Sequence, residues 1–218
     1  MFQGILLDLD GTLADSLESL AVSCNKALEN VHLPAQPVEA YKKFAGDGPP
    51  TLVKKALAAA GDKDGKYYDE VLEGYQEELK AYKNYKVDTF DGMREALTAI
   101  RQSGGKLAVI TNKPQDRAVE VVESLFGKDF FHLIVGFSER FPRKPDPSST
   151  KYAMEELGIE PEKCMYVGDT NVDMKTGKGA GAFTVGVLWG FRDRKELEEN
   201  GADCIISHPS ELEQLWKR

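Results

Sequence analysis

The stretch Leu6-Leu7-Asp8-Leu9-Asp10-Gly11-Thr12-Leu13 (LLDLDGTL) places two carboxylates at the end of an apolar run that begins at Gly4. A short, almost wholly apolar run predicts a strand covered on both faces, as in a parallel sheet. Alternation along a strand predicts that the side chains of Asp8 and Asp10 point the same way. Two carboxylates so close repel one another unless a cation or specific hydrogen bonds hold them, so this strand end is a candidate functional site.

Five further apolar runs predict strands of the same kind, at residues 106–111, 133–137, 164–168, 183–187 and 204–206. Helical patterns lie between and after them, at residues 93–103, 115–126, 148–157, 172–179 and 210–216. Strands that alternate with helices predict an α/β fold built on a doubly wound, Rossmann-like parallel sheet.

One interval, from residue 15 to about residue 86, contains no strand-like run. Its first helical face is marked by Leu17, Leu20, Ala21, Cys24, Leu28 and Val31. Further helical patterns at residues 38–44, 51–60 and 67–82 are separated by GDGPP (46–50) and GDKDG (61–65). We therefore expect a core domain formed by residues 1–15 and 87–218, and a helical cap domain formed by residues 16–86.

The composition limits the classes of partner. A formal net charge of −8 argues against a nucleic-acid backbone and against anionic membrane surfaces. No run approaches the length of a membrane span, and Met1-Phe2-Gln3-Gly4 leads directly into the first strand without the pattern of a signal peptide. Cys24, Cys164 and Cys204 are far apart in the sequence, which favours reduced, buried thiols. A cytoplasmic protein, monomeric or homodimeric, is expected.

Polar side chains follow several of the predicted strands, and ligands of parallel α/β sheets collect at that edge. Besides Asp8 and Asp10, these side chains are Thr111, Asn112, Lys144, Asp169 and Asp173. Such a cluster, with oxygen ligands and no grouped His or Cys, favours Mg²⁺. Taken singly, each has an ordinary alternative: Thr111 could bond its own turn, Lys144 could be solvated, and Asp173 could simply favour the first turn of a helix.

The joint pattern resembles the haloacid dehalogenase superfamily of aspartate-nucleophile phosphotransferases. Four motifs of that family occur in order: DLDGT (8–12), ITNK (110–113), RKPDP (143–147) and GDTNVD (168–173). The helical insertion after the first motif is similar to the mobile cap of the family.

The resemblance implies roles for individual residues. Asp8 would attack phosphorus and Asp10 would act as acid and then base. Thr111 and Lys144 would be catalytic and would hold the phosphoryl group together with Gly11, Thr12 and Asn112. The resemblance implies that Mg²⁺ binds Asp8, the Asp10 main-chain carbonyl and Asp169, with support from Asp173.

The remainder of the chain resembles one branch of the family, the phosphoglycolate phosphatases, in VGVLWGFRDRKEL (185–197), GADCIISHPSEL (201–212) and FAGDGPPTLV (44–53). A magnesium-dependent phosphatase acting on a small phosphate ester, most readily 2-phosphoglycolate, is therefore expected. A pyrophosphatase, a sugar-phosphate phosphatase or a phosphoglucomutase needs the same core residues. From other classes, a phospho-accepting receiver module or a catalytically idle binding protein stays open.

Overall fold

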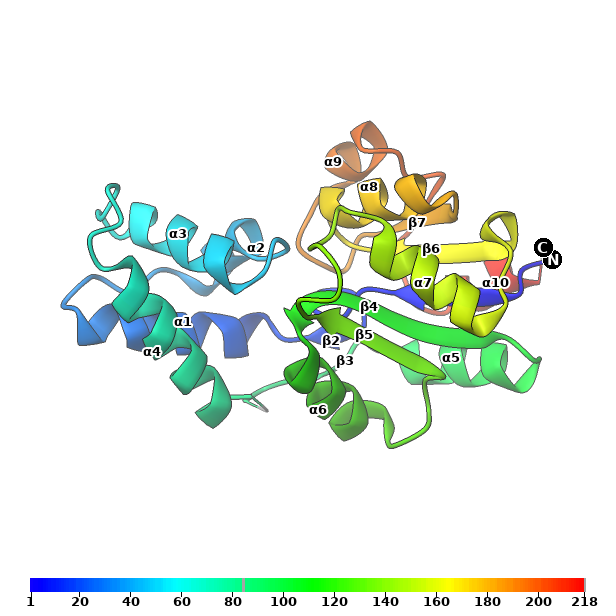
Figure 1. The fold of residues 1–218 in the computed structure, drawn as a ribbon, viewed down its shortest axis with the longest axis horizontal. Coiled ribbons are helices and arrows are strands. Elements are labelled where there is room, and N and C mark those ends of the chain that lie inside the picture. Colours follow the sequence, from blue (N-terminus) through cyan, green and yellow to red (C-terminus); the bar gives the residue numbers. More distant parts are fainter. Residues whose placement is uncertain (84, 218) are drawn as a thin grey trace. The chain divides into compact units, whose positions relative to one another are not determined.

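The computed structural model describes residues 1–83 and 85–217, and the chain divides into two compact units (Figure 1). One unit comprises Met1–Ala14 and Thr89–Arg218, and the other comprises Asp15–Asp88. The boundaries expected from the sequence, after residue 15 and before residue 87, lie within two residues of these divisions.

The larger unit is built on a parallel sheet, which confirms the predicted fold class. Within the described residues the sheet has six strands in the order β5-β4-β1-β6-β7-β8, and every neighbouring pair is parallel. The strands are β1 (Gly4–Leu7), β4 (Lys106–Pro114), β5 (Leu133–Phe137), β6 (Cys164–Gly168), β7 (Phe183–Val187) and β8 (Cys204–Ile206).

The central strand β1 sets the position of the site. All four of its residues are buried, because β4 and β6 flank its edges and helices cover its faces. Leu7 lies opposite Val109 of β4 and Val167 of β6. The segments that continue from these three strands therefore emerge side by side at the carboxyl edge of the sheet, where ligands of such folds bind.

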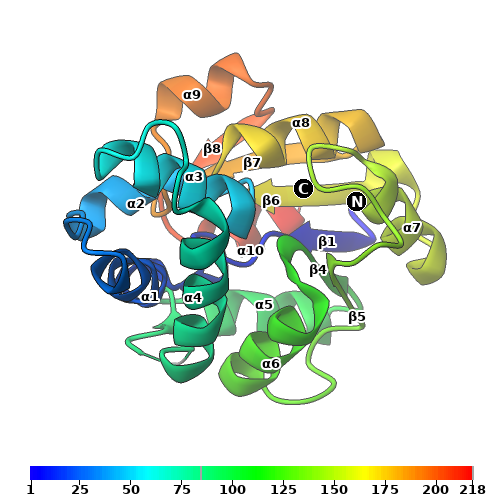
Figure 2. The ribbon, with the colours of Figure 1, turned by 60° about the vertical axis from the view of Figure 1, so that its left-hand side comes forward.

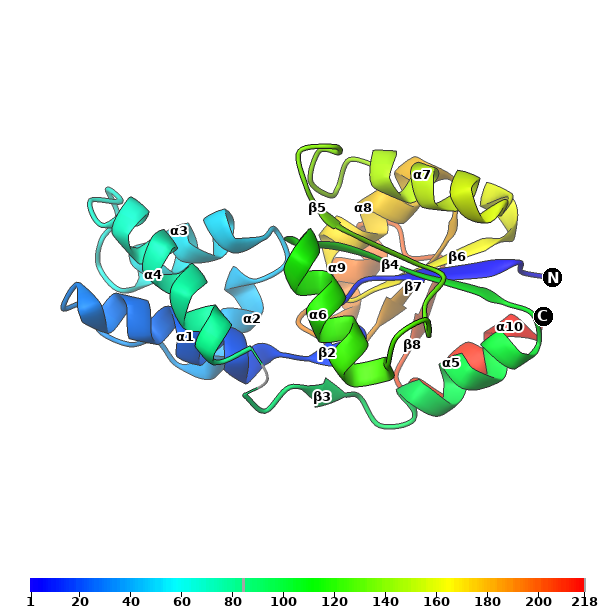
Figure 3. The same cartoon turned by 60° about the horizontal axis from the view of Figure 1, so that its bottom comes forward.

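Helices cover both faces of the sheet. Figure 3 shows α7 and α8 on one face and α5, α6 and α10 on the other. These helices are α5 (Met93–Gln102), α6 (Gln115–Phe126), α7 (Ser148–Leu157), α8 (Asn171–Ala180) and α10 (Glu211–Trp216). Leu6, Ile110 and Tyr166 from three adjacent strands pack in one buried cluster with Ala153 and Met154 of α7. Each fully buried large apolar side chain of this kind contributes about 1.5–3 kcal/mol.

The smaller unit is helical, as the sequence predicts. It contains α1 (Leu17–Asn30), the short 3₁₀ helix η1 (Val38–Ala40), α2 (Tyr41–Phe44), α3 (Pro49–Ala59) and α4 (Tyr68–Ala81). Helix α1 packs along α4, and α3 packs on the same helix (Figure 2). The six residues predicted to mark the apolar face between Leu17 and Val31 are all buried.

Two short strands, one helix and the length of β4 differ from the sequence-based expectation. The short strands β2 (Ala14–Asp15) and β3 (Asp88–Thr89) pair with each other, and strands of two residues carry too little periodicity to detect. Helix α9 (Arg194–Glu199) was not predicted, although Asp193 caps it by accepting a hydrogen bond from the Glu196 N–H. Strand β4 continues three residues beyond Thr111.

Across the described residues, no helix is both long enough and apolar enough to span a membrane.

Candidate active site

The predicted site residues gather at the carboxyl edge of β1, β4 and β6. Asp8 follows β1 directly, Thr111 lies near the end of β4, and Asp169 follows β6. Asp173 lies in the first turn of α8, and Lys144 arrives on the loop before α7. Oxygens of Asp8, Asp169 and Asp173 lie within 4.8 Å of one another, so these three residues, called the acidic group below, could hold a metal ion.

Lys144 lies between two of these carboxylates. Its Nζ is 2.8 Å from Oδ1 of Asp8 and 2.7 Å from Oδ1 of Asp173, and it donates a hydrogen bond to the Ile110 carbonyl at 3.0 Å. The Lys144 side chain is only 2% exposed. Burial alone would lower the pKa of Lys144, but the charges of Asp173 and Asp8 together raise it well above the usual value. The lysine is therefore a fixed positive charge in the site.

Asn112 holds the main chain of Lys144. Its side-chain amide donates to the Lys144 carbonyl at 3.2 Å, and its oxygen accepts from the Lys144 N–H at 2.8 Å. The family resemblance implies that Asn112 contacts the substrate. The structure shows that its amide positions the lysine, and a contact between Asn112 and substrate stays a prediction.

Asp169 is fully buried and held by two donors from distant segments. Oδ1 accepts from the Thr12 hydroxyl at 2.9 Å, and Oδ2 accepts from the Phe191 N–H at 2.8 Å. The segment after β7 approaches so closely that a Cβ at Gly190 would lie 2.3 Å from the Asp169 Cβ. Gly11 has a φ of 86°, and a Cβ there would lie 2.4 Å from Oδ2 of Asp169. Glycine is therefore required at both positions.

The segment that contains Phe191 was missed as part of the site. Trp189 of this segment donates from Nε1 to the Thr12 carbonyl at 3.0 Å, so it also supports the turn that follows β1. Glycine and aromatic residues directly after a strand, as in LWGF (188–191), are the signal that could have indicated it. Thr12 uses its hydroxyl on Asp169, and the N–H groups of Gly11 and Thr12 donate to Ala14 and Leu9 carbonyls. Their direct contact with substrate stays a prediction.

Asp173 caps a helix and contacts Lys144, and its support of a metal ion stays a prediction. Its Oδ2 accepts from the Thr170 N–H at 3.0 Å and from the Thr170 hydroxyl at 2.6 Å, which completes a capping box at the start of α8. Its Oδ1 is the oxygen that contacts Lys144. Asp173 therefore anchors a helix terminus and the Lys144 side chain at once.

The carboxylate of Asp10 contacts the ammonium of Lys113. Strand β1 ends at Leu7, so both Asp8 and Asp10 follow the strand, and the expectation that their side chains point the same way stays a prediction. Both carboxylate oxygens of Asp10 accept hydrogen bonds of 2.9 Å from Nζ of Lys113. Neither the sequence pattern nor the family resemblance implies a role for Lys113.

The acidic group carries more negative charge than its lysine balances. Burial raises the pKa of Asp8 from 3.8 to about 7, and the charge of Asp173 adds to this shift. Burial and the charges of Asp173 and Asp8 raise the pKa of Asp169 well above its usual value. Among the described groups, Oδ1 of Asp8 also finds no partner with hydrogen-bond geometry, although Nζ of Lys144 is close. Three carboxylates against one ammonium fit a divalent cation with oxygen ligands.

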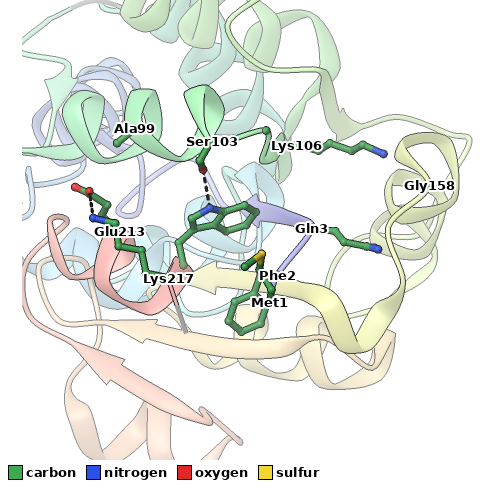
Figure 4. A pocket seen from close by; sticks show the side chains of 11 residues that line it. Met1, Phe2, Gln3, Ala99, Ser103, Lys106, Gly158, Glu213 and Lys217 are labelled. Atoms are coloured by element: carbon green, nitrogen blue, oxygen red, sulfur yellow. Dashed lines mark hydrogen bonds and ion pairs between the residues drawn. The ribbon is translucent and has the colours of Figure 1, made fainter.

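A separate pocket lies at the opposite edge of the sheet. Its volume is about 560 Å³, and it is lined by residues that precede β1 and β4, including Phe2 and Ser103, together with Trp216 of α10. Figure 4 shows the indole hydrogen bond to the Ser103 hydroxyl at 2.8 Å. Because these residues lie at the amino ends of the strands, this pocket does not include the acidic group.

Comparison with known proteins adds evidence to this geometry. Residues 5–187 match the model of the haloacid dehalogenase-like hydrolase family. The phosphoglycolate phosphatase of Aquifex aeolicus is 33% identical over 211 residues, which cover 97% of this chain and 95% of that protein. The phosphoglycolate phosphatase of Chromobacterium violaceum is 32% identical over 220 residues, covering 99% and 96%.

Solved structures agree with the sequence relatives. A candidate phosphoglycolate phosphatase from Lactobacillus delbrueckii subsp. bulgaricus has a TM-score of 0.93 at 29% identity, covering 99% of this chain and 98% of that chain. The family match begins in β1 and ends with β7, so it includes Asp8, Lys144 and the acidic group. The chain belongs to the haloacid dehalogenase-like hydrolase family.

Proposed function

We propose that the protein is a magnesium-dependent phosphatase that hydrolyses a small phosphate monoester through an aspartyl phosphate on Asp8. The observation that carries this proposal is the buried ion pair of Asp8 and Lys144 beside Asp169 and Asp173, at the ends of adjacent strands. Phosphoryl transfer needs positioned groups and neutralised oxygens more than it needs elaborate covalent chemistry. This arrangement supplies a nucleophile, a fixed cation and a further cation site.

In the first half-reaction, a carboxylate oxygen of Asp8 forms a bond to phosphorus while the bond from phosphorus to the ester oxygen breaks. Lys144 offsets the charge that Asp8 and the phosphoryl group share. Asp10 donates a proton to the departing alkoxide, so the leaving group departs as a neutral alcohol. Thr111, which is 6% exposed and lies in β4 three residues before its end, is placed to hold a phosphoryl oxygen.

In the second half-reaction, water attacks the phosphorus of the aspartyl phosphate and the bond from phosphorus to Asp8 breaks. Asp10, now ionised, accepts the proton of that water and is ready for the next turnover. One carboxyl group thus serves both half-reactions because each leaves it in the protonation state that the other requires.

A metal ion fits the donor set. Asp8 and Asp169 would bind it with carboxylate oxygens and Asp10 with its main-chain carbonyl, while Asp173 supports the site through Lys144 and the α8 terminus. Mg²⁺ is the cation proposed because the group offers hard oxygen ligands. When bound, the cation neutralises the phosphoryl oxygens and favours the ionised form of Asp8.

The substrate proposed is 2-phosphoglycolate. Relatives that carry this activity in their names match nearly the whole chain, the helical unit included. The three cysteines are free thiols, which supports a reducing compartment such as the cytoplasm.

The test is inorganic phosphate release from 2-phosphoglycolate, pyrophosphate, glucose 6-phosphate and 4-nitrophenyl phosphate, each with Mg²⁺ and with EDTA. The highest kcat/KM is expected for 2-phosphoglycolate, and EDTA should abolish release from every substrate. If pyrophosphate or the sugar phosphate gives a higher kcat/KM, that compound replaces 2-phosphoglycolate as the proposed substrate. No release from any of them would overturn the proposed activity and favour a switch or a binding protein.

Without a bound metal ion, the protein should be more stable at pH 5.5 than at pH 8, because of the raised pKa of Asp8. The pKa of Asp8 is about 7 in the metal-free fold and 3.8 is its ordinary value, so the folded state binds an extra proton between these values. The contribution of Asp8 to the free energy of unfolding is therefore largest near pH 3.8, and it is lost as the pH rises to about 7. The Tm of the EDTA-treated protein should therefore be higher at pH 5.5 than at pH 8.

Bound Mg²⁺ should reverse this pH preference, because the cation stabilises the ionised carboxylates. The rise in Tm on adding Mg²⁺ is expected to be larger at pH 8 than at pH 5.5. Thermal unfolding of the wild type and of Asp8→Asn at both pH values measures it, and the variant should show a weaker pH dependence without metal. Equal Mg²⁺-induced shifts at the two pH values would contradict the assigned cause.

A further inference from the structure

Lys113 is the group that holds the carboxylate of Asp10. Nζ of Lys113 lies 2.9 Å from each of the two oxygens, so the carboxylate is fixed at two points. The Lys113 side chain is 8% exposed and that of Asp10 is 19% exposed. Little solvent screens an ion pair at this depth, and a charge-assisted pair with two contacts restricts the rotation of the carboxylate.

The local backbone is built to place Lys113 there. Strand β4 pairs regularly with β5 as far as Ile110 opposite Val135, and pairing resumes only at Pro114 opposite Phe137. An advance of four residues along β4 thus corresponds to two residues along β5, which is a β-bulge. Bulges often change the direction of side chains next to active sites. Thr111, Asn112 and Lys113 lie in this irregular stretch.

Two neighbouring residues keep the bulge in place. The Gln115 side chain accepts from the Gly136 N–H at 2.6 Å and donates to the Ile134 carbonyl at 3.1 Å, so it stands in for ladder partners. A Cβ at Gly136 would lie 2.6 Å from the Gln115 Cα and 2.9 Å from the Lys113 carbonyl. The direction of the Lys113 side chain is therefore determined by packed backbone.

We propose that Lys113 is a positioning residue that aims the Asp10 carboxyl group at the ester oxygen of the substrate. This inference rests on the proposed function, in which Asp10 delivers a proton to the leaving group. The orientation of this carboxyl group matters because a displacement of about 1 Å can cost ~10²-fold in rate.

Two other roles for a buried lysine in this place predict different kinetics. If the lysine binds the phosphoryl group, its removal lowers kcat/KM equally for every phosphate ester. A lysine that binds the carboxylate of 2-phosphoglycolate acts on that substrate alone. A positioning role depends instead on the leaving group, since a poor alkoxide leaving group needs the proton and a nitrophenolate does not.

The experiment compares wild type with Lys113→Met on 2-phosphoglycolate, ethyl phosphate and 4-nitrophenyl phosphate at saturating Mg²⁺. The readout is the ratio of kcat/KM between substrates, which is independent of the fraction of folded enzyme. Because kcat/KM includes only steps up to departure of the leaving group, the shared hydrolysis of the aspartyl phosphate does not enter it.

Lys113→Met should lower kcat/KM for both alkyl phosphates by at least ~10-fold relative to 4-nitrophenyl phosphate, a part of the ~10²–10⁴-fold that a positioned acid contributes. Lys113→Arg, which offers two donors to the same carboxylate, should restore most of the ratio. Lys128→Met, an exposed lysine at the opposite edge of the sheet, is the matched control.

Each remaining outcome decides against the inference. Equal loss on all three substrates would assign Lys113 to the phosphoryl group, and loss on 2-phosphoglycolate alone would assign it to the substrate carboxylate. An unchanged kcat/KM for every substrate in Lys113→Met would remove any role of Lys113 in the first half-reaction. If the wild type itself releases no phosphate from any ester, the proposed function fails instead, and the two failures are distinguishable.

Discussion

Asp8→Asn is expected to lower the rate of phosphate release by at least ~10⁴-fold, because an amide cannot form the acyl phosphate and loss of a nucleophile removes the whole covalent route. The fold should survive. The Asp8 carboxyl lies in a group of buried carboxylates that repel it, so a neutral side chain of the same shape relieves repulsion. Steady-state phosphate release and denaturation by urea measure the two effects separately.

Two further observations make this prediction specific to the nucleophile. Acid quenching during turnover should trap one phosphoryl group on wild-type Asp8 and none on the variant, as judged by the mass of the peptide that contains residue 8. Asp129→Asn is a matched control, since Asp129 is exposed at the opposite edge of the sheet and its φ of 62° suits asparagine. More than about 1% residual activity in Asp8→Asn, with Asp8→Ala equally active, would exclude Asp8 as the nucleophile.

Lys144→Met should both inactivate and destabilise the protein. The lysine side chain is 2% exposed and lies 2.8 Å from Asp8 and 2.7 Å from Asp173, so its removal leaves buried carboxylates without their counter-charge. Breaking one side of such a pair costs about 3–5 kcal/mol of unfolding free energy. Loss of a fixed charge beside the phosphoryl group should lower kcat by at least ~10³-fold. Urea unfolding with EDTA and phosphate release with Mg²⁺ measure the two losses.

A second substitution separates the electrostatic cost from a general loss of packing. Adding Asp173→Asn to Lys144→Met removes one of the uncompensated charges, so part of the lost unfolding free energy should return while activity does not. Lys128→Met again serves as the exposed control. An unfolding free energy unchanged in Lys144→Met would contradict the assigned ion pairs.

Much of the site was predictable because its signals are local. Apolar runs that end in Asp8, Thr111 and Asp169 reflect strands buried on both faces, and burial of that kind is visible in any short window. The helical insertion was predictable for the same reason, since 3.6-residue periodicity marks the buried face of α1. The family resemblance then related Lys144 and Asp173 to the same chemistry.

Local patterns carry no information about which strands become neighbours or which loops approach them. The order β5-β4-β1-β6-β7-β8, which puts the ends of β4 and β6 beside β1, follows from packing of the whole sheet. Thr12 and Asp169 are 157 residues apart in the sequence, and Lys113 and Asp10 are 103 apart. Their side-chain contacts depend on turn geometry and on the bulge in β4.

The α/β class, the inserted helical unit and the residue types at the strand ends follow from the sequence alone, because each depends on the burial of neighbours in the chain. The folded structure was needed to show that Lys113 holds Asp10, that Asn112 holds Lys144, and that the Phe191 N–H holds Asp169. These contacts join segments far apart in the sequence, and long-range packing alone brings them within hydrogen-bond distance.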